Sequence, residues 1–314
     1  MKIIVMEPLG ISDAEMSSLI ESSDNQVIVY DTKTTDSQEQ IKRAETADVL
    51  IIANTPLAGD VIKACPQLKM ISVAFAGVDH VDMKTCKERN ILVSNAAGYS
   101  THAVAELAIG LTLSVLRNIP RCDKRTREFS TMSGLMGHEL YGKTFAIVGT
   151  GAIGTKTARL AHAFGCKLLA YSRTEKEELT ALGVTYVSLE ELMSSADIIS
   201  LHTPLTDATR GMIDKEKLDL MKSSAILINT ARGPIVDNAY LSKLLSEGRI
   251  AGAGIDVFDV EPPLRNEDTL ISNENTVLTP HIAYATYESI LRRASIVFEN
   301  ITAWQSGKPQ NIMS

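Results

Sequence analysis

The sequence has few cysteines and no excess of positive charge. Four of its 314 residues are cysteine, and 31 Lys and Arg stand against 38 Asp and Glu, for a formal net charge of −7 at pH 7. The acidic balance argues against nucleic acid or an anionic membrane surface as the main partner. The cysteines are scattered and form no C-x-x-C pair. We therefore expect free thiols in a reducing compartment, and no metal site.

Long apolar segments are absent as well. No run approaches the roughly 18 consecutive apolar residues that a membrane span needs. The N-terminal MKIIVMEPLG also lacks a basic region followed by an apolar stretch. We therefore expect a cytoplasmic protein with no membrane partner. The length predicts about two domains, each large enough to bury a core.

Short β-branched runs alternate with amphipathic helical segments along the chain. Continuous apolar strands separated by helices are typical of a parallel sheet covered on both faces. The strands fall into two series, which predicts an α/β protein with two doubly wound parallel sheets. Strands of the first series are expected at 2–6, 27–30, 49–52 and 70–73, and those of the second at 144–148, 168–171, 198–201, 225–228 and 253–257.

Two predicted helices stand apart from this alternation. The segment 100–116 is apolar nearly all round, so it must be covered by something. It is either a core helix between domains or a surface for a partner chain, and the sequence leaves both open. The segment 287–304 predicts a long C-terminal helix that can pack on either domain.

A glycine-rich turn follows the strand predicted at 144–148. Gly149, Gly151 and Gly154 form G-x-G-x-x-G between a strand and a helix. The first glycine permits a tight turn, the second lets the backbone approach a pyrophosphate, and the third allows close packing of helix on strand. The start of the helix then offers free N–H groups to phosphates. In this setting the motif predicts dinucleotide binding.

The end of the next strand indicates which dinucleotide is preferred. A carboxylate about 20 residues past the glycine turn would bind a free ribose 2′-hydroxyl. Here the chain has Arg173 between Ser172 and Thr174 instead. The planar guanidinium can bind a 2′-phosphate, so we favour NADP(H). NAD(H) is the alternative if Arg173 is only a solvated turn residue.

Three polar residues each follow an apolar, strand-like run of the second series: Arg232, Glu261 and His281. In an open parallel sheet such positions lie at the carboxyl edge, where ligands bind. Arginine can bind a carboxylate and polarise a carbonyl. Histidine can transfer the proton that accompanies hydride delivery, with a glutamate to hold its ring. From spacing alone this set carries little weight, because isolated Arg, Glu and His are usually structural or solvated.

The ordered motifs closely resemble those of the D-isomer-specific 2-hydroxyacid dehydrogenase family, over nearly the whole chain. The matching segments are FAGVDHVD (75–82), GYSTHAVAE (98–106), GTGAIG (149–154), LHTPLTDATRGMI (201–213), NTARGPIVD (229–237), GIDVFDVEPP (254–263) and TPHIAYAT (279–286). The resemblance implies a flavodoxin-like substrate domain formed by 1–98 and 286–314. It also implies a Rossmann cofactor domain at 99–285, and a homodimer is expected.

The resemblance implies a role for each matched residue. Arg232 would bind the substrate's carboxylate and carbonyl oxygen, His281 would be the acid/base, and Glu261 its partner. Substrate binding is expected at Ala76, Gly77, Val78, Arg232 and His281. Cofactor binding is expected at Gly149, Gly151, Ala152, Ile153, Gly154, Ser172, Arg173, Thr174, Thr203, Thr230 and Asp256, with Asp256 on the nicotinamide carboxamide.

The sequence departs from the family pattern beside the expected catalytic histidine. The family commonly has Gly and then a small residue there, whereas this chain has Ala283 and Tyr284. A larger side chain at this position is expected to reshape the pocket beside the nicotinamide.

The substrate is predicted from the segment 51–57. Phosphoglycerate dehydrogenases of this family present basic residues there, whereas IIANTPL has neither Lys nor Arg and looks more like glycerate or hydroxypyruvate reductases. We therefore favour a small unphosphorylated 2-keto acid, hydroxypyruvate or glyoxylate. A phosphoglycerate or D-lactate-type dehydrogenase is the alternative. From another class, a nucleotide-sensing corepressor stays open by analogy of fold. A formate dehydrogenase is disfavoured, because the formate dehydrogenases with this fold have Gln at the position of Glu261.

Overall fold

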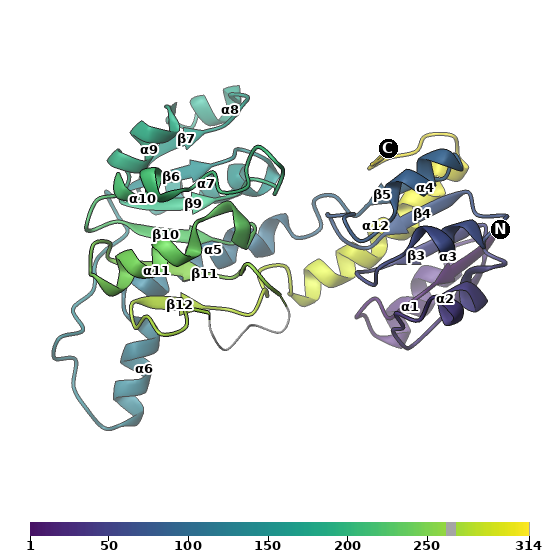
Figure 1. The fold of residues 1–314 in the computed structure, drawn as a ribbon, viewed down its shortest axis with the longest axis horizontal. Helices are drawn as coiled ribbons and strands as arrows, with labels where there is room; N and C mark the ends of the chain where they lie inside the picture. Colours follow the sequence, from purple (N-terminus) through teal and green to yellow (C-terminus); the bar gives the residue numbers. More distant parts are fainter. Residues whose placement is uncertain (262–267, 314) are drawn as a thin grey trace. The chain divides into compact units, whose positions relative to one another are not determined.

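The chain forms two α/β units, each built around one parallel sheet (Figure 1). The computed structural model describes residues 1–261 and 268–313. Unit 1 comprises Met1–Ser100 and Ala285–Ser314, and unit 2 comprises Thr101–Tyr284. The prediction of two parallel-sheet α/β domains is confirmed.

The sheet of unit 1 has five parallel strands in the order β2-β1-β3-β4-β5, the flavodoxin-like order. Every residue of β3 and β4 is buried, as expected for apolar strands covered on both faces. The strand β5 was not predicted, because its short LVSN sequence has a polar end. The strands are β1 (Lys2–Val5), β2 (Gln26–Val29), β3 (Val49–Ile52), β4 (Met70–Val73) and β5 (Leu92–Asn95).

The C-terminal helix α12 (Tyr287–Gln305) belongs to unit 1, where it packs against β4 and β5 (Figure 1). Buried polar contacts fix it there: Ser72 Oγ donates to the carbonyl of Val297 at 3.0 Å, and Asn300 Nδ2 donates to the carbonyl of Asn95 at 2.9 Å. The remaining helices of the unit are α1 (Asp13–Glu21), α2 (Ser37–Ala44), α3 (Gly59–Lys63) and α4 (Met83–Glu88).

The sheet of unit 2 has seven parallel strands in the order β12-β11-β10-β9-β6-β7-β8. The order reverses at β6, so the turn after β6 and the turn after β9 meet at the carboxyl edge, where doubly wound sheets bind ligands. The short strands β8 and β12 escaped prediction. The strands are β6 (Thr144–Val148), β7 (Lys167–Tyr171), β8 (Val184–Tyr186), β9 (Ile198–Leu201), β10 (Ile226–Asn229), β11 (Gly252–Ile255) and β12 (Thr276–Leu278).

The apolar helix α5 (Thr101–Leu116) packs against α7 and against β10 and β11 in unit 2. In the described part of the chain, no single helix is long and apolar enough to cross a membrane. The bent pair of α5 and α6 (Ile119–Arg127) meets that requirement by length and composition only. The other helical segments of the unit are α7 (Ala152–Ala163), α8 (Glu177–Thr180), α9 (Leu189–Ser195), α10 (Lys215–Asp219), η1 (Gly233–Ile235) and α11 (Asn238–Ser246).

Candidate active site

The glycine turn lies between β6 and α7, and its glycines have different surroundings. Gly149 has φ of 96°, and a Cβ there would lie 2.9 Å from the carbonyl oxygen of His202. A Cβ on Gly154 would lie 2.0 Å from the carbonyl oxygen of Gly149. A Cβ on Gly151 would meet nothing within 4 Å. The first and third glycines are therefore required by packing, whereas the second borders open space into which a ligand can come.

The beginning of α7 fits a phosphate group. Gly151 is the N-cap and supplies no side-chain cap, so the first N–H groups and the positive end of the helix dipole are available. Two buried hydroxyls at the ends of neighbouring strands, Thr203 Oγ1 and Thr230 Oγ1, have no hydrogen-bond partner in the described structure. Unpaired buried hydroxyls are costly, and a bound polar ligand would satisfy them. These residues therefore fit a dinucleotide.

The turn after β7 holds a second cation besides Arg173. Arg173 is exposed. Lys176, which was not predicted, donates from Nζ to Thr155 Oγ1 in the first turn of α7 at 3.0 Å. Lys176 lies three residues after Arg173 in the sequence, which could have pointed to it as a second cation. Its contact with α7 follows only from the fold. Its other neighbour is Glu178, whose carboxylate lies 4.0 Å from Nζ and partly offsets the charge.

Arg232 follows β10, on a turn that the buried side chain of Asn229 holds. Asn229 Nδ2 donates to the carbonyl of Arg232 at 3.0 Å, and its Oδ1 accepts from the N–H of Ala231 at 3.0 Å. The guanidinium is exposed and donates from Nη1 to the carbonyl of Ala231 at 2.7 Å. Within the described residues it hydrogen-bonds to neither Glu261 nor His281, so most of its donors are available to a ligand.

The turn that carries Arg232 is tied to the segment that leads to Glu261. A Cβ on Gly233 would lie 2.1 Å from the backbone carbonyl carbon of Phe258, so only glycine allows this approach. Asn238 Nδ2 donates both to the carbonyl of Gly233 at 3.1 Å and to Asp259 Oδ1 at 2.8 Å. The two segments are thus fixed relative to each other.

Asp256 holds the loop that carries His281. It follows β11, is fully buried, and accepts at Oδ1 from Thr279 Oγ1 (2.5 Å) and the N–H of Ile282 (2.9 Å). At Oδ2 it accepts from the N–H of Ala283 at 2.9 Å. Burial raises the pKa of this carboxyl group. The contact of Asp256 with a nicotinamide carboxamide stays a prediction. In the structure, its hydrogen bonds hold the loop that carries His281.

Glu261 and His281 lie in direct hydrogen-bond contact. Glu261 Oε2 accepts a hydrogen bond from His281 Nδ1, and Glu261 Oε1 accepts one from the N–H of Phe258. His281 has φ of 56°, a left-handed conformation that is uncommon outside glycine and is found at active sites. A carboxylate on Nδ1 fixes the tautomer and leaves Nε2 for a reacting group.

The two residues that depart from the family pattern lie against this histidine. Ala283 is buried, with its N–H on Asp256. The ring of Tyr284 meets the His281 ring edge to face, with centroids 5.8 Å apart and an interplanar angle of 82°. Tyr284 therefore packs on the imidazole and limits its rotation.

In unit 1 the segment Ala76, Gly77 and Val78 follows β4. Asn95 Nδ2 donates to the carbonyl of Ala76 at 2.6 Å, and Arg293 stacks on the Phe75 ring at 4.5 Å, which together hold the segment. Within the described residues, none of the three N–H groups at 76–78 donates a hydrogen bond. Consecutive free N–H groups are suited to bind a carboxylate.

Comparison with known proteins gives one consistent result. The family described as D-isomer specific 2-hydroxyacid dehydrogenase, NAD binding domain, matches residues 109–283. The chain is 39% identical over 282 residues to a glyoxylate reductase of Korarchaeum cryptofilum (87% of this chain, 85% of the relative). It is 33% identical over 324 residues to a hydroxypyruvate reductase of Blautia hydrogenotrophica, with both chains fully covered.

A solved structure agrees with these relatives. The D-isomer specific 2-hydroxyacid dehydrogenase of Lactobacillus delbrueckii ssp. bulgaricus, in its NAD complexed form, superposes with a TM-score of 0.86 at 30% identity and covers 100% of both chains. The similarity therefore extends over both units.

Proposed function

Because the chain belongs to the D-isomer specific 2-hydroxyacid dehydrogenase family, an oxidoreductase family that acts on CH–OH donors with a nicotinamide cofactor, we propose that Arg232, Glu261 and His281 are its catalytic residues. Among small 2-keto acids, glyoxylate and hydroxypyruvate are favoured, in line with the relatives. The observation that carries the proposal is the Glu261–His281 pair on a loop anchored by Asp256.

The chemistry follows from the free ring nitrogen of His281. When bound, the reduced nicotinamide supplies a hydride to the carbonyl carbon of the keto acid. His281 donates a proton from Nε2 to the carbonyl oxygen, so that the carbonyl becomes a hydroxyl. Glu261, on Nδ1, stabilises the protonated ring and holds its orientation. In the reverse direction the same nitrogen accepts the proton.

Two groups are assigned to the substrate's negative charge. The exposed Arg232 guanidinium binds the carboxylate through its fork and polarises the carbonyl oxygen. The free N–H groups of Ala76, Gly77 and Val78 are assigned to the carboxylate as well.

For the cofactor, we assign Gly149, Gly151, Ala152, Ile153 and Gly154 to the pyrophosphate, and Thr203, Thr230 and Asp256 to the remainder. Ser172, Arg173 and Thr174 are assigned to the 2′-phosphate of NADP(H), which we propose as the preferred form. The exposed Arg173, with Lys176 beside α7, supports this preference.

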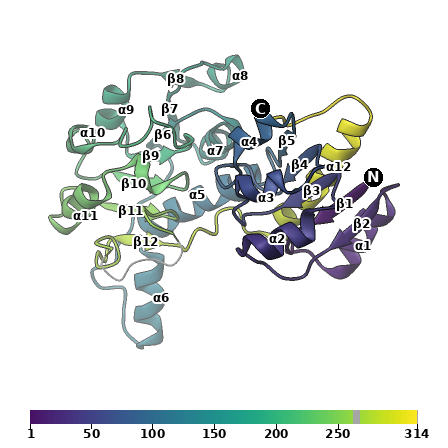
Figure 2. The same ribbon diagram turned by 45° about the vertical axis from the view of Figure 1, so that its right-hand side comes forward.

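We also propose a cytoplasmic homodimer, with α6 and the loop after it as the contact surface. This region extends away from the sheet of unit 2 in both views (Figure 1, Figure 2). It exposes large apolar side chains, with Phe129 98%, Met136 82% and Tyr141 76% exposed. Exposed apolar side chains of this size are found at interfaces between chains. Its test is the mass in solution: Phe129→Asp should yield monomers, and an unchanged mass would contradict the surface.

The proposed activity is tested by following NADPH or NADH absorbance with glyoxylate, hydroxypyruvate, pyruvate and 3-phosphohydroxypyruvate. Arg232→Lys should lose about 2–4 kcal/mol of transition-state stabilisation, because a point charge cannot replace the planar fork. Near-normal kcat/KM in that variant would exclude the role of Arg232. No turnover across the whole panel would favour the corepressor alternative.

A further inference from the structure

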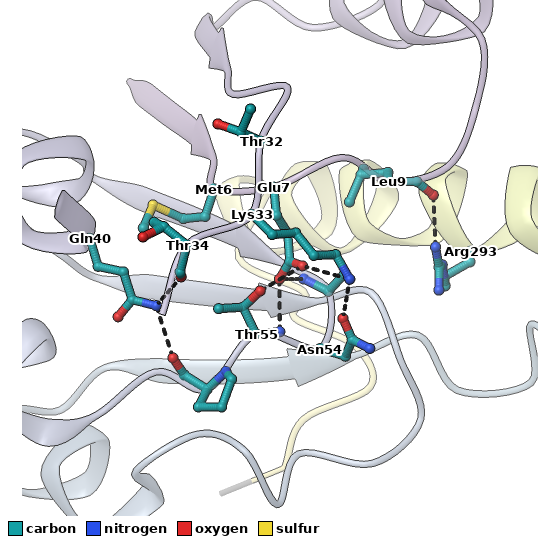
Figure 3. Close-up of polar contacts among 12 residues, drawn as sticks. Met6, Glu7, Leu9, Thr32, Lys33, Thr34, Gln40, Asn54, Thr55 and Arg293 are labelled. Carbon is teal, nitrogen blue, oxygen red and sulfur yellow. Dashed lines mark hydrogen bonds and ion pairs between the residues drawn. The ribbon is translucent and has the colours of Figure 1, made fainter. Parts of the chain in front are cut away.

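A second polar cluster lies in unit 1, around the side chain of Glu7 (Figure 3). Glu7 follows β1 and is fully buried. Its Oε1 accepts from the N–H of Ala53 at 2.9 Å and from that of Thr55 at 3.0 Å, and its Oε2 accepts from Thr55 Oγ1 at 2.8 Å. All three partners are donors, which is the environment that a carboxylate requires. Glu7 therefore fixes the loop after β3.

The same carboxylate is paired with a cation from a third loop. Lys33, in the loop after β2, places Nζ 3.5 Å from Glu7 Oε2 and donates to Asn54 Oδ1 at 2.7 Å (Figure 3). The Lys33 side chain is 56% exposed, so its ammonium group is held by two partners and still faces solvent. The segment 51–57 has no Lys or Arg of its own. The fold supplies one to it from elsewhere in the sequence.

The position of Lys33 is fixed on both sides by buried side chains of α2. Arg43 Nη1 donates to the carbonyl of Thr32 at 2.7 Å. Gln40 Nε2 donates to the carbonyl of Thr34 at 2.9 Å and to the carbonyl of Pro56 at 3.0 Å (Figure 3). Gln40 thereby ties the loop of Lys33 to the loop of Asn54. A lysine on a freely moving surface loop would have no such support.

This cluster borders the segment with the free N–H groups. The N–H of Leu57 donates to the carbonyl of His80 at 2.8 Å, and the N–H of Asp82 donates to the carbonyl of Leu57 at 3.1 Å. The loop after β3 and the loop after β4 therefore run side by side within unit 1. The loop of Asn54 therefore adjoins the loop whose N–H groups we assign to the substrate's carboxylate.

We propose that Lys33 and Asn54 form the subsite for the substituent on C3 of the 2-keto acid, and that Glu7 is the positioning residue that selects a hydroxyl over an anionic group there. The inference rests on the proposed function and names its substrate class, a 3-hydroxylated 2-keto acid. Lys33 and the amide of Asn54 supply donors for a hydroxyl oxygen. Because the charge of Lys33 is already balanced by Glu7, a phosphate or carboxylate on C3 would meet an ion pair instead of a free cation.

The test compares three substrates that differ at C3 or lack it. Glyoxylate has no C3, hydroxypyruvate has a hydroxyl there, and 3-phosphohydroxypyruvate has a phosphate. Glu7→Gln keeps Oε1 for the two N–H groups and can donate to Thr55 Oγ1, so its fold should persist, as a melting curve will verify. In this variant the charge of Lys33 is no longer balanced by a carboxylate. The ratio of kcat/KM for phosphohydroxypyruvate to that for hydroxypyruvate should therefore rise about tenfold.

A second variant removes the cation without touching the core. Lys33→Met should lower kcat/KM for hydroxypyruvate about tenfold and leave that for glyoxylate within about twofold. The matched control is Lys69→Met, because Lys69 is also 56% exposed and also pairs with a carboxylate, Asp48, at 3.0 Å. Lys69→Met should change kcat/KM for neither hydroxypyruvate nor glyoxylate.

The outcomes distinguish a wrong subsite from a wrong proposed activity. An unchanged substrate ratio in Glu7→Gln, or an equal loss for glyoxylate and hydroxypyruvate in Lys33→Met, would overturn the subsite while leaving the proposed dehydrogenase activity intact. No turnover of glyoxylate, hydroxypyruvate or phosphohydroxypyruvate by the unmodified protein would overturn both.

Discussion

The two units use the same device at the carboxyl edges of their sheets. In each, a fully buried carboxylate just past a strand accepts two backbone N–H groups and one threonine hydroxyl. In unit 1 this is Glu7, with Thr55. In unit 2 it is Asp256, with Thr279. A buried acceptor with this many donors rigidifies the loop that it holds, because each N–H left unpaired would cost free energy.

The difference lies in what the fixed loop presents. Glu7 has a cation beside it, Lys33, which remains half-exposed. Asp256 has no ion-pair partner among the described residues, and its loop holds His281 in a left-handed conformation against Glu261. In our proposal, the Glu7 carboxylate therefore serves substrate recognition in unit 1, where charge balance matters, and Asp256 serves the chemistry in unit 2, where the orientation of the His281 ring matters.

The largest effect should come from His281, because we assign the proton transfer to this residue of unit 2. His281→Gln should lower kcat for glyoxylate about 10²–10⁴-fold, the usual contribution of a positioned acid/base. His162→Gln is the control, since His162 is an exposed histidine of the same unit, and it should leave kcat unchanged. Steady-state kinetics at neutral pH measures both, and near-normal turnover in His281→Gln would refute the assignment.

An isosteric amide substitution in each buried carboxylate tests whether the two units have different roles. Asp256→Asn replaces an acceptor by an N–H donor that faces the backbone of Ile282 or Ala283, so the loop of His281 should shift and kcat for glyoxylate should fall about 10–100-fold. Glu7→Gln should leave the same kcat within about twofold. If both variants lost kcat equally, the division of roles between the units would be wrong.

A smaller effect is expected for the cofactor, whose proposed binding residues all lie in unit 2. Arg173→Ala should raise KM for NADPH about tenfold by removing a charge-assisted contact with the 2′-phosphate. KM for NADH should not change, which makes it the internal control. A clear preference of the unmodified protein for NADH would contradict the NADP(H) proposal.

The smallest effect is one of pH on stability. Burial raises the pKa of Asp256, so the folded chain keeps this proton to a higher pH than the unfolded chain does. The stability that this group contributes is therefore complete below the ordinary Asp pKa of about 3.9 and declines as the pH rises through the raised value. The Tm of the unmodified protein minus that of Asp256→Asn should be largest at acidic pH and shrink toward neutrality. A Tm difference that grows as the pH rises would contradict the raised pKa of Asp256.

Many strands of the fold could be predicted from local sequence. The strands at 49–52, 70–73, 144–148 and 198–201 were predicted with the bounds that the structure has, because continuous apolar runs between helices have few other solutions. The short strands at 92–95, 184–186 and 276–278 were missed. A run of three or four residues is too short to show a periodicity, and only the pairing with neighbouring strands makes these segments part of the sheet.

Local sequence specifies the chemical groups that the protein has available: the glycine turn, and an arginine, a glutamate and a histidine that each follow a strand-like run. Local motifs can do this because a turn or a strand end is specified within a few residues. Which of these groups lie next to one another depends on the three-dimensional fold. It placed Lys33 beside Asn54 and Lys176 beside α7, and it gave the buried carboxylates of Glu7 and Asp256 their donors from distant loops. Charge balance and hydrogen-bond satisfaction depend on distances of a few ångströms across the chain, which no run of neighbouring residues encodes.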